Sequence, residues 1–329
     1  MYDKFYQLSG IPFQLTPDSR FFFGSSGHRR AIAHLVYGLA QEEGFVVITG
    51  EVGAGKTTLV EQLWSQLDRQ TYTMARIVTT RVSGDDLLRL VAAGFGVPDE
   101  GNTDKATLLR RFERVATDQR AAGRRCLLVV DEVQNLDMTA LEELRMLSNI
   151  TADGRALVQT ILLAQPQFRT ALANPDLEQL RQRVLASYHL GPLTDAETRA
   201  YIEHRLRRVG WIDDPGWEDA AFAHVYRYTD GIPRRINTLC SRVLLYGSIE
   251  EAHTITGPMV EATANELAHD LGAGLATPSV SVAAANAPTS AASVSDALVR
   301  RIEAVESGIA RQDRVFRRIM DLLTAMTDR

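Results

Sequence analysis

The stretch Gly50-Glu51-Val52-Gly53-Ala54-Gly55-Lys56-Thr57 decides the fold. It matches the pattern G-x-x-x-x-G-K-[ST], whose glycines let backbone N–H groups curl around an anion. An apolar run, residues 45–48, precedes the loop, and an amphipathic stretch, residues 58–67, follows it. The pattern requires this order of strand, loop and helix, because the helix N-terminus adds positive potential. The alternative is a chance match in a loop that contains glycine.

The chemistry of this loop indicates a nucleotide. We expect the Lys56 ammonium to reach the β- and γ-phosphates and the Thr57 hydroxyl to bind Mg²⁺. The sequence therefore predicts a site for ATP and Mg²⁺. The residues expected to contact the nucleotide are Gly50, Glu51, Val52, Gly53, Ala54, Gly55, Lys56, Thr57 and Thr58.

Further apolar runs of strand length follow along the chain. They comprise residues 76–79, 126–130 and 157–164, with a weaker run at 186–190. Amphipathic stretches such as residues 105–121 separate them. Short apolar runs that alternate with helical patterns predict strands buried on both faces of a sheet. The repeated order predicts an α/β fold with a mostly parallel five-stranded sheet between helices.

Two adjacent carboxylates, Asp131 and Glu132, follow the run at residues 126–130. Ligands bind at the C-terminal ends of the strands in open parallel sheets. Asp131 is therefore a candidate for the Mg²⁺ shell, and Glu132 for the general base that activates the attacking water. The plainer interpretation, a strand that ends in solvated acids, is less favoured beside a phosphate-binding loop. The pair predicts hydrolysis of ATP by an enzyme that carries its own base.

Two more polar residues are catalytic candidates because of their positions relative to the loop and the two carboxylates. Gln165 follows the run at residues 157–164, so we expect it beside Asp131 in the sheet, where it can orient the water. Arg234 opens a helix within Gly231-Ile232-Pro233-Arg234-Arg235, in which proline suits the first helical turn. From there Arg234 can fold onto the phosphates. The alternatives are an ordinary strand-end glutamine and a local contact at a helix start.

Arg181 and Arg183 end a predicted helix before the fifth strand. In a ring assembly, one of them can reach the γ-phosphate of a neighbouring subunit, as an arginine finger does. The alternative is that both are solvated surface arginines. The sequence does not distinguish which of the two would be the finger.

Composition argues against several classes of protein. The formal net charge is −5 and the pI is about 5.9, which does not favour bulk binding of nucleic acid, although a local basic patch stays open. Cys126 and Cys240 lack the spacing of a zinc site or a disulfide framework. The N-terminus does not resemble a secretory signal, and no run of about 18 apolar residues occurs. We expect a cytoplasmic protein that reaches the inner membrane only through a partner.

The chain divides into four predicted segments. Residues 1–192 carry the strand patterns and form the nucleotide-binding domain. Residues 193–270 show only helical patterns and predict a small all-helical lid domain. Residues 271–295 lack charged residues, and their Ala, Ser, Thr, Val and Pro content predicts a flexible linker. The helical patterns of the lid lie at residues 195–209, 217–228, 234–246 and 257–268.

Residues 296–329 show a heptad pattern with one polar residue in the seam. The seam residues are Leu298, Ile302, Val305, Ile309, Gln312, Phe316, Ile319, Leu323 and Met326. Alternating spacings of four and three predict a coiled-coil helix that self-associates or captures a partner helix. The alternative is one amphipathic helix docked on the body of the protein.

The order of these motifs resembles that of the AAA+ ATPases. Over residues 1–268 the chain is similar to the ExeA/GspA-like secretion ATPases within that group. Segments that carry this resemblance are Phe13-Gln14-Leu15-Thr16-Pro17-Asp18, Phe21-Phe22-Phe23-Gly24, Asp131-Glu132-Val133-Gln134-Asn135-Leu136, Leu141-Glu142-Glu143-Leu144-Arg145 and Leu180-Arg181-Gln182-Arg183. A nearer resemblance, to the ATPase of the PEP-CTERM/exosortase (XrtA) locus, is carried by Ser187-Tyr188-His189-Leu190-Gly191-Pro192-Leu193 and Tyr201-Ile202-Glu203-His204-Arg205-Leu206-Arg207-Arg208-Val209-Gly210-Trp211.

The resemblance implies a homo-oligomeric ATPase with shared ATP sites, in bacteria that make exopolysaccharide and sort PEP-CTERM proteins. It also implies contact with membrane-associated machinery, for which the C-terminal helix is the candidate. ExeA-type proteins continue into a transmembrane helix and a cell-wall-binding domain, and the sequence shows neither, which argues against direct work on peptidoglycan. In AAA+ proteins the N-terminal segment lines the adenine pocket, so Phe13, Phe21 and Phe22 are candidates for that pocket or for plain core.

Two classes of function follow. The first is a motor-like ATPase that assembles or powers an envelope export or exopolysaccharide system. The second is an ATP-dependent DNA-binding regulator that resembles the AAA+ proteins of transposition. The acidic charge and the resemblance favour the first. A weaker third hypothesis is an ATP-gated scaffold whose tail recruits a partner.

Overall fold

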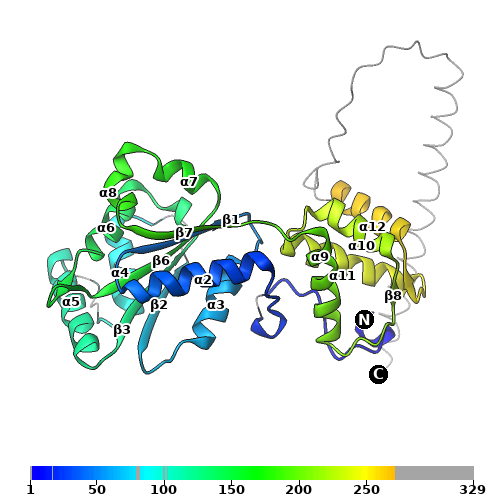
Figure 1. Ribbon diagram of the computed structural model, residues 1–329, viewed down its shortest axis with the longest axis horizontal. Coiled ribbons are helices and arrows are strands. Elements are labelled where there is room, and N and C mark those ends of the chain that lie inside the picture. Colours follow the sequence, from blue (N-terminus) through cyan, green and yellow to red (C-terminus); the bar gives the residue numbers. More distant parts are fainter. Residues whose placement is uncertain (1, 17, 79–81, 99–100, 102, 271–329) are drawn as a thin grey trace, which may run out of the picture.

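The computed structural model describes residues 2–16, 18–78, 82–98, 101 and 103–270. The predicted linker at 271–295 and the predicted coiled coil at 296–329 lie outside these residues. Two bodies are visible in Figure 1, a sheet with its covering helices and a smaller helical domain. Among the described residues, no helix is both long and apolar enough to cross a membrane.

Five strands form one sheet in the order β2-β3-β6-β1-β7. Every neighbouring pair in it is parallel, so the predicted α/β fold is confirmed and this sheet is parallel throughout. A separate antiparallel pair, β4 (Thr151–Ala152) and β5 (Arg155–Ala156), lies outside it. The strands of the main sheet are β1 (Phe45–Gly50), β2 (Tyr72–Val78), β3 (Arg125–Asp131), β6 (Val158–Ala164) and β7 (Val184–Leu190).

Helices cover both faces of this sheet (Figure 1). In β3, Cys126, Leu128 and Val130 face one apolar cluster, and Leu127 and Val129 face the other, because successive side chains of a strand point to opposite faces. The first cluster is covered by α4 (Gly84–Gly94), α5 (Lys105–Ala121), α6 (Met138–Leu147), α7 (Gln167–Leu172), η3 (Pro175–Leu177) and α8 (Glu178–Arg181). The second is covered by α2 (Ser26–Gln41) and α3 (Lys56–Gln66).

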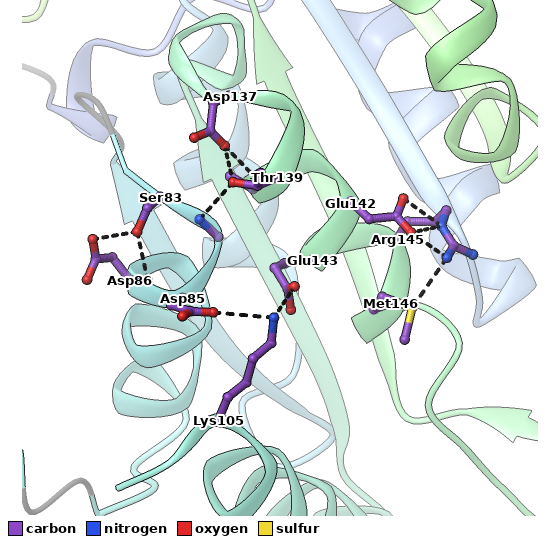
Figure 2. Close-up of polar contacts among 12 residues, drawn as sticks. Ser83, Asp85, Asp86, Lys105, Asp137, Thr139, Glu142, Glu143, Arg145 and Met146 are labelled. Atoms are coloured by element: carbon purple, nitrogen blue, oxygen red, sulfur yellow. Dashed lines mark hydrogen bonds and ion pairs between the residues drawn. The ribbon is translucent and has the colours of Figure 1, made fainter. Parts of the chain in front are cut away.

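One lysine ties three of these helices together, as Figure 2 shows. Lys105 starts α5, and its ammonium contacts Asp85 of α4 at 3.3 Å and Glu143 of α6. Elsewhere on α6, Arg145 pairs with Glu142 one turn earlier. The partly exposed contacts of Lys105 join α4, α5 and α6.

The helical domain follows the last strand of the sheet. It differs from the expected all-helical domain by one short parallel pair, β8 (Gly216–Trp217) with β9 (Thr254–Ile255). Two residues per strand are too few to give a sequence signal. The helices of the domain are α9 (Asp195–Arg207), α10 (Asp219–Thr229), α11 (Pro233–Ile249) and α12 (Gly257–Asp270).

The N-terminal segment packs mainly on the helical domain. It contains α1 (Tyr2–Phe5) and the short helix η1 (Ser19–Phe21). The Tyr6 hydroxyl donates a 3.0 Å hydrogen bond to the Ala252 carbonyl, and Arg205 Nε donates to the Pro12 carbonyl at 2.7 Å. The side chains buried in the core of the helical domain include Tyr2, Tyr6, Leu8, Phe13 and Phe21. The segment precedes the sheet in the sequence and was predicted to belong with it. Its buried side chains, however, lie in the core of the helical domain.

Candidate nucleotide-binding site

The glycine-rich loop links β1 to α3 at the C-terminal edge of the sheet. Gly53 and Gly55 have φ angles of +84° and +97°, a region that L side chains rarely adopt. The loop therefore curls in a way that exposes backbone N–H groups to a bound anion, with the start of α3 directly behind it. This is the arrangement that the sequence pattern predicts.

Lys56 is the first residue of α3 and is only 5% exposed. Its ammonium donates to the Gly50 carbonyl at 2.7 Å and to the Glu51 carbonyl at 3.0 Å. Burial lowers the pKa of Lys56, while the nearby carboxylates of Glu132 and Asp131 act in the opposite direction. The ammonium thus lies against the loop, beside the space that phosphates would enter.

The Thr57 hydroxyl, one residue after Lys56, lies against the Asp131 carboxylate. Thr57 Oγ1 donates to Asp131 Oδ2 at 2.7 Å, and Arg76 of β2 reaches the same oxygen at 3.3 Å. Arg76 also pairs with Glu61 of α3 at 3.1 Å. Oxygen donors of this kind suit Mg²⁺, which is usually bound by one or two protein oxygens together with substrate phosphates. No group of three or more His, Cys, Asp or Glu that could hold a metal occurs among the described residues.

Two amide side chains hold the candidate base. Glu132 follows β3 with a φ of +55°, an uncommon conformation for a residue other than glycine. Gln165 Nε2 donates to Glu132 Oε2 at 3.0 Å, and the Gln134 amide donates to the same oxygen. Gln134 Oε1 in turn accepts a 2.9 Å hydrogen bond from the Gln165 backbone. The two amides, which follow β3 and β6 in the sequence, therefore orient the Glu132 carboxylate.

The helical domain closes one side of the loop. The Arg234 backbone N–H donates to the Gly53 carbonyl at 3.2 Å, and a Cβ placed on Gly53 would lie 2.3 Å from Arg234 Cβ. The α11 helix starts at Pro233, as expected, and Arg234 is its second residue. The cleft between the domains measures about 190 Å³, and Lys56, Thr57, Glu132 and Arg234 all line it.

Aromatic residues line the other end of the cleft. Phe21, Phe22 and Phe23 contribute to its wall, whereas Phe13 is not part of it and lies in the core of the helical domain. Arg205 of α9 lines the same end, with its guanidinium over the Phe21 ring at 4.7 Å. Flat apolar faces beside a phosphate-binding loop suit a nucleobase.

The two candidate arginine fingers lie outside this cleft. Arg181 pairs with Glu178 one turn earlier on α8, and its side chain is 49% exposed. Arg183 Nη1 donates to the Ser148 carbonyl at 3.2 Å. Within one chain, neither guanidinium joins the residues that surround the loop.

Several residues of the site escape sequence analysis. Gln134 carries a local signal, because it lies two positions after Glu132 just beyond the end of a strand. Arg76 sits on β2 and meets Asp131 across the sheet, where β2 pairs with β3. His28 and Arg205 come from distant helices, and no local pattern marks them as parts of the cleft.

Comparison with known proteins agrees with this geometry. Residues 39–172 match the family model described as AAA domain. The chain is 36% identical over 267 residues to general secretion pathway protein A of Aeromonas hydrophila, an alignment that covers 81% of this chain. The alignment covers 48% of that relative, so the chain spans about half of its length.

Solved structures share the fold at low identity. The Aeropyrum pernix ORC2 protein, solved as ADPNP–ADP complexes, is 17% identical with a TM-score of 0.56, covering 74% of this chain and 69% of that one. The ORC1 protein of the same organism, solved in complex with DNA, is 15% identical with a TM-score of 0.57, covering 75% and 66%. This chain thus has the α/β P-loop fold, and its residues 39–172 match the AAA-domain model.

Proposed function

We propose that the chain is a Mg²⁺-dependent ATPase. The observation that carries this proposal is the meeting of three parts at one edge of the sheet. The curled loop with its buried Lys56, the Thr57–Asp131 pair and the Glu132 carboxylate come from separate segments of the chain. Phosphate binding, metal binding and water activation need these parts within reach of each other.

Each residue has one role in the proposal. Residues 50–58 bind the phosphates, with Lys56 supplying the positive charge. Thr57 and Asp131 would hold Mg²⁺, which neutralises charge on the phosphate oxygens. Glu132 accepts a proton from the attacking water, and Gln165 and Gln134 hold its carboxylate in place. Arg234 would contact the phosphates from the lid.

Removal of divalent metal gives the direct test of this proposal. We expect the wild-type chain to hydrolyse ATP with Mg²⁺, and to lose that turnover when EDTA is added, because Thr57 and Asp131 need the metal to contribute. Added Mg²⁺ should restore the rate. Release of inorganic phosphate measures it. An equal rate without divalent metal would contradict the role of the Thr57–Asp131 pair.

We further propose that the ATP site is shared between subunits of a homo-oligomer, with Arg181 or Arg183 acting on its neighbour. Because both lie outside the cleft of their own chain, a trans role gives them access to a γ-phosphate. Mixing inactive Arg183→Ala with inactive Glu132→Gln should then restore some hydrolysis, since a mixed interface pairs an intact arginine with an intact glutamate. The same mixing with Arg181→Ala identifies which of the two acts. No recovery at any ratio, with mixed oligomers shown by co-purification of differently tagged subunits, would count against the shared site.

For the cellular role, we propose that the ATPase assembles or powers an envelope export system of the exosortase and exopolysaccharide type. The name of the Aeromonas relative supports a secretion pathway, and the segments at 187–193 and 201–211 support the exosortase type through their resemblance. Replacing the native gene with a Lys56→Ala allele should reduce exported polysaccharide in the native host. If the allele leaves export unchanged, and double-stranded DNA stimulates hydrolysis in a salt-sensitive manner, the DNA-binding regulator is the better hypothesis.

A further inference from the structure

His28 lies behind the phosphate-binding loop and belongs to none of the motifs above. It is the third residue of α2, is 6% exposed, and lines the cleft. Phe22 contacts its ring edge-on, with the centroids 5.7 Å apart. A Cβ placed on Gly55 would lie 2.9 Å from His28 Nε2, so the ring occupies the space directly under the loop.

The hydrogen bonds of His28 define which nitrogen carries the proton. Ser25 is the N-cap of α2, and its Oγ accepts the His28 backbone N–H at 3.2 Å. The same Oγ lies 2.7 Å from His28 Nδ1. The backbone bond to Ala54 raises the pKa of His28, as a bond donated by the ring does, and the nitrogen at the loop is Nε2. In the neutral ring Nδ1 then accepts the proton of the Ser25 hydroxyl. Nε2–H therefore faces the loop, where the ring hydrogen-bonds the Ala54 backbone.

The ring is neutral under physiological conditions. Burial lowers the pKa of His28 to about 4, although Glu197 acts against this shift. A neutral imidazole with one fixed donor can hold a backbone carbonyl without adding a charge that would need its own partner.

The helix end that carries His28 is also joined to the lid. The Ser26 backbone N–H donates to Glu197 Oε1 at 2.7 Å, and Glu197 belongs to the capping box at the start of α9. On the other side, Arg234 of α11 contacts Gly53. The helical domain therefore contacts the loop directly through Arg234, and contacts the end of α2 that carries His28 through Glu197.

We propose that His28 is a positioning residue that fixes the phosphate-binding loop through a hydrogen bond from Nε2 to the Ala54 carbonyl. The inference rests on the proposed nucleotide site. A loop held in its binding conformation before the ligand arrives loses less freedom on binding, so its affinity for phosphates is higher. His28 touches no phosphate itself and acts only through the loop.

Two substitutions separate the donor from the ring. His28→Phe keeps an aromatic ring and removes both nitrogens, whereas His28→Gln places an amide N–H at a reach similar to Nε2. We expect His28→Phe to weaken ADP binding by about tenfold, the typical cost of one lost hydrogen bond, and to raise KM for ATP by a similar factor with a smaller change in kcat. His28→Gln should stay within about threefold of wild type. His34→Phe, on the same helix but outside the cleft, is the matched control.

Calorimetry with ADP and steady-state turnover measure these effects on the full chain, and thermal melting checks that each variant folds. Wild-type ADP affinity in His28→Phe, or equal losses in His28→Phe and His28→Gln, would overturn the inference while leaving the ATPase proposal intact. Failure of the wild type to bind ADP or ATP would overturn the ATPase proposal, and this inference with it. Should His28→Phe not fold, ¹⁵N spectra of the wild-type imidazole decide: a proton on Nε2 supports the inference, and a proton on Nδ1 contradicts it.

Discussion

Glu132→Gln should bind ATP as tightly as the wild type and turn it over at least about a hundredfold more slowly. The glutamine amide has the size of the carboxylate and can stay between Gln134 and Gln165, but it cannot accept a proton from water. Loss of a general base typically costs 10²–10⁴ in rate. Because Glu132 contributes when water attacks, the loss should appear in kcat and leave the affinity for ATP unchanged.

Calorimetric affinity and phosphate release are the two measurements for this variant. Glu142→Gln provides a matched control, because its carboxylate pairs with Arg145 on the surface of α6 and lies outside the cleft (Figure 2). Turnover of Glu132→Gln at the wild-type rate would remove Glu132 as the base. A loss of affinity instead of rate would show that the carboxylate acts in the ground state.

Lys56→Ala should lose at least about thirtyfold in affinity for ATP and ADP. The substitution removes a buried cation beside the loop, and a truncated charge contact of this kind typically costs 2–5 kcal/mol. It also frees the carbonyls of Gly50 and Glu51, which now accept from the ammonium. Without the ammonium, the negative ends of those carbonyl dipoles would repel the phosphates.

The matched control is Lys105→Ala, which removes a lysine that also contacts two carboxylates but lies on the rim of the helices. It should keep wild-type affinity for both nucleotides. Titration with each nucleotide measures both variants, and thermal melting shows that the folds are intact. Wild-type affinity in Lys56→Ala would contradict the assignment of this loop to phosphate binding.

Local patterns predicted the parts of the fold that depend on nearby residues. The helix α5 begins and ends where its pattern predicts, at Lys105–Ala121. Its start is fixed within one turn, because the Asp104 side chain accepts the Thr107 backbone N–H at 3.0 Å. The inner strand β3 was also clear, since burial on both faces demands an unbroken apolar run.

The edge strand β2 was predicted too short. It runs over Tyr72–Val78, but its pattern was recognised only from residue 76. The strand lies at the end of the sheet and is partly exposed along its first half, so Thr73 is tolerated there. Because an edge strand needs fewer apolar side chains, its apolar pattern in the sequence is weaker.

The composition of the site was predictable only in part. Motifs identified the loop, Asp131 and Glu132, and the order of the strands places Gln165 beside them, with its amide on Glu132. The contributions of His28, Arg76 and Arg205 depend on contacts between separate elements. Such contacts follow from tertiary packing, which a single sequence does not encode in any local spacing.

The packing of the N-terminal segment on the helical domain affects the order in which the protein can fold during synthesis. Tyr6 is translated 246 residues before Ala252, its hydrogen-bond partner, and Pro12 precedes Arg205 by 193 residues. The whole parallel sheet emerges from the ribosome between them. The sheet can therefore fold first, while Tyr2, Tyr6 and Phe13 stay exposed until α9 to α12 arrive. Helices made after the sheet therefore complete the burial of the N-terminal residues.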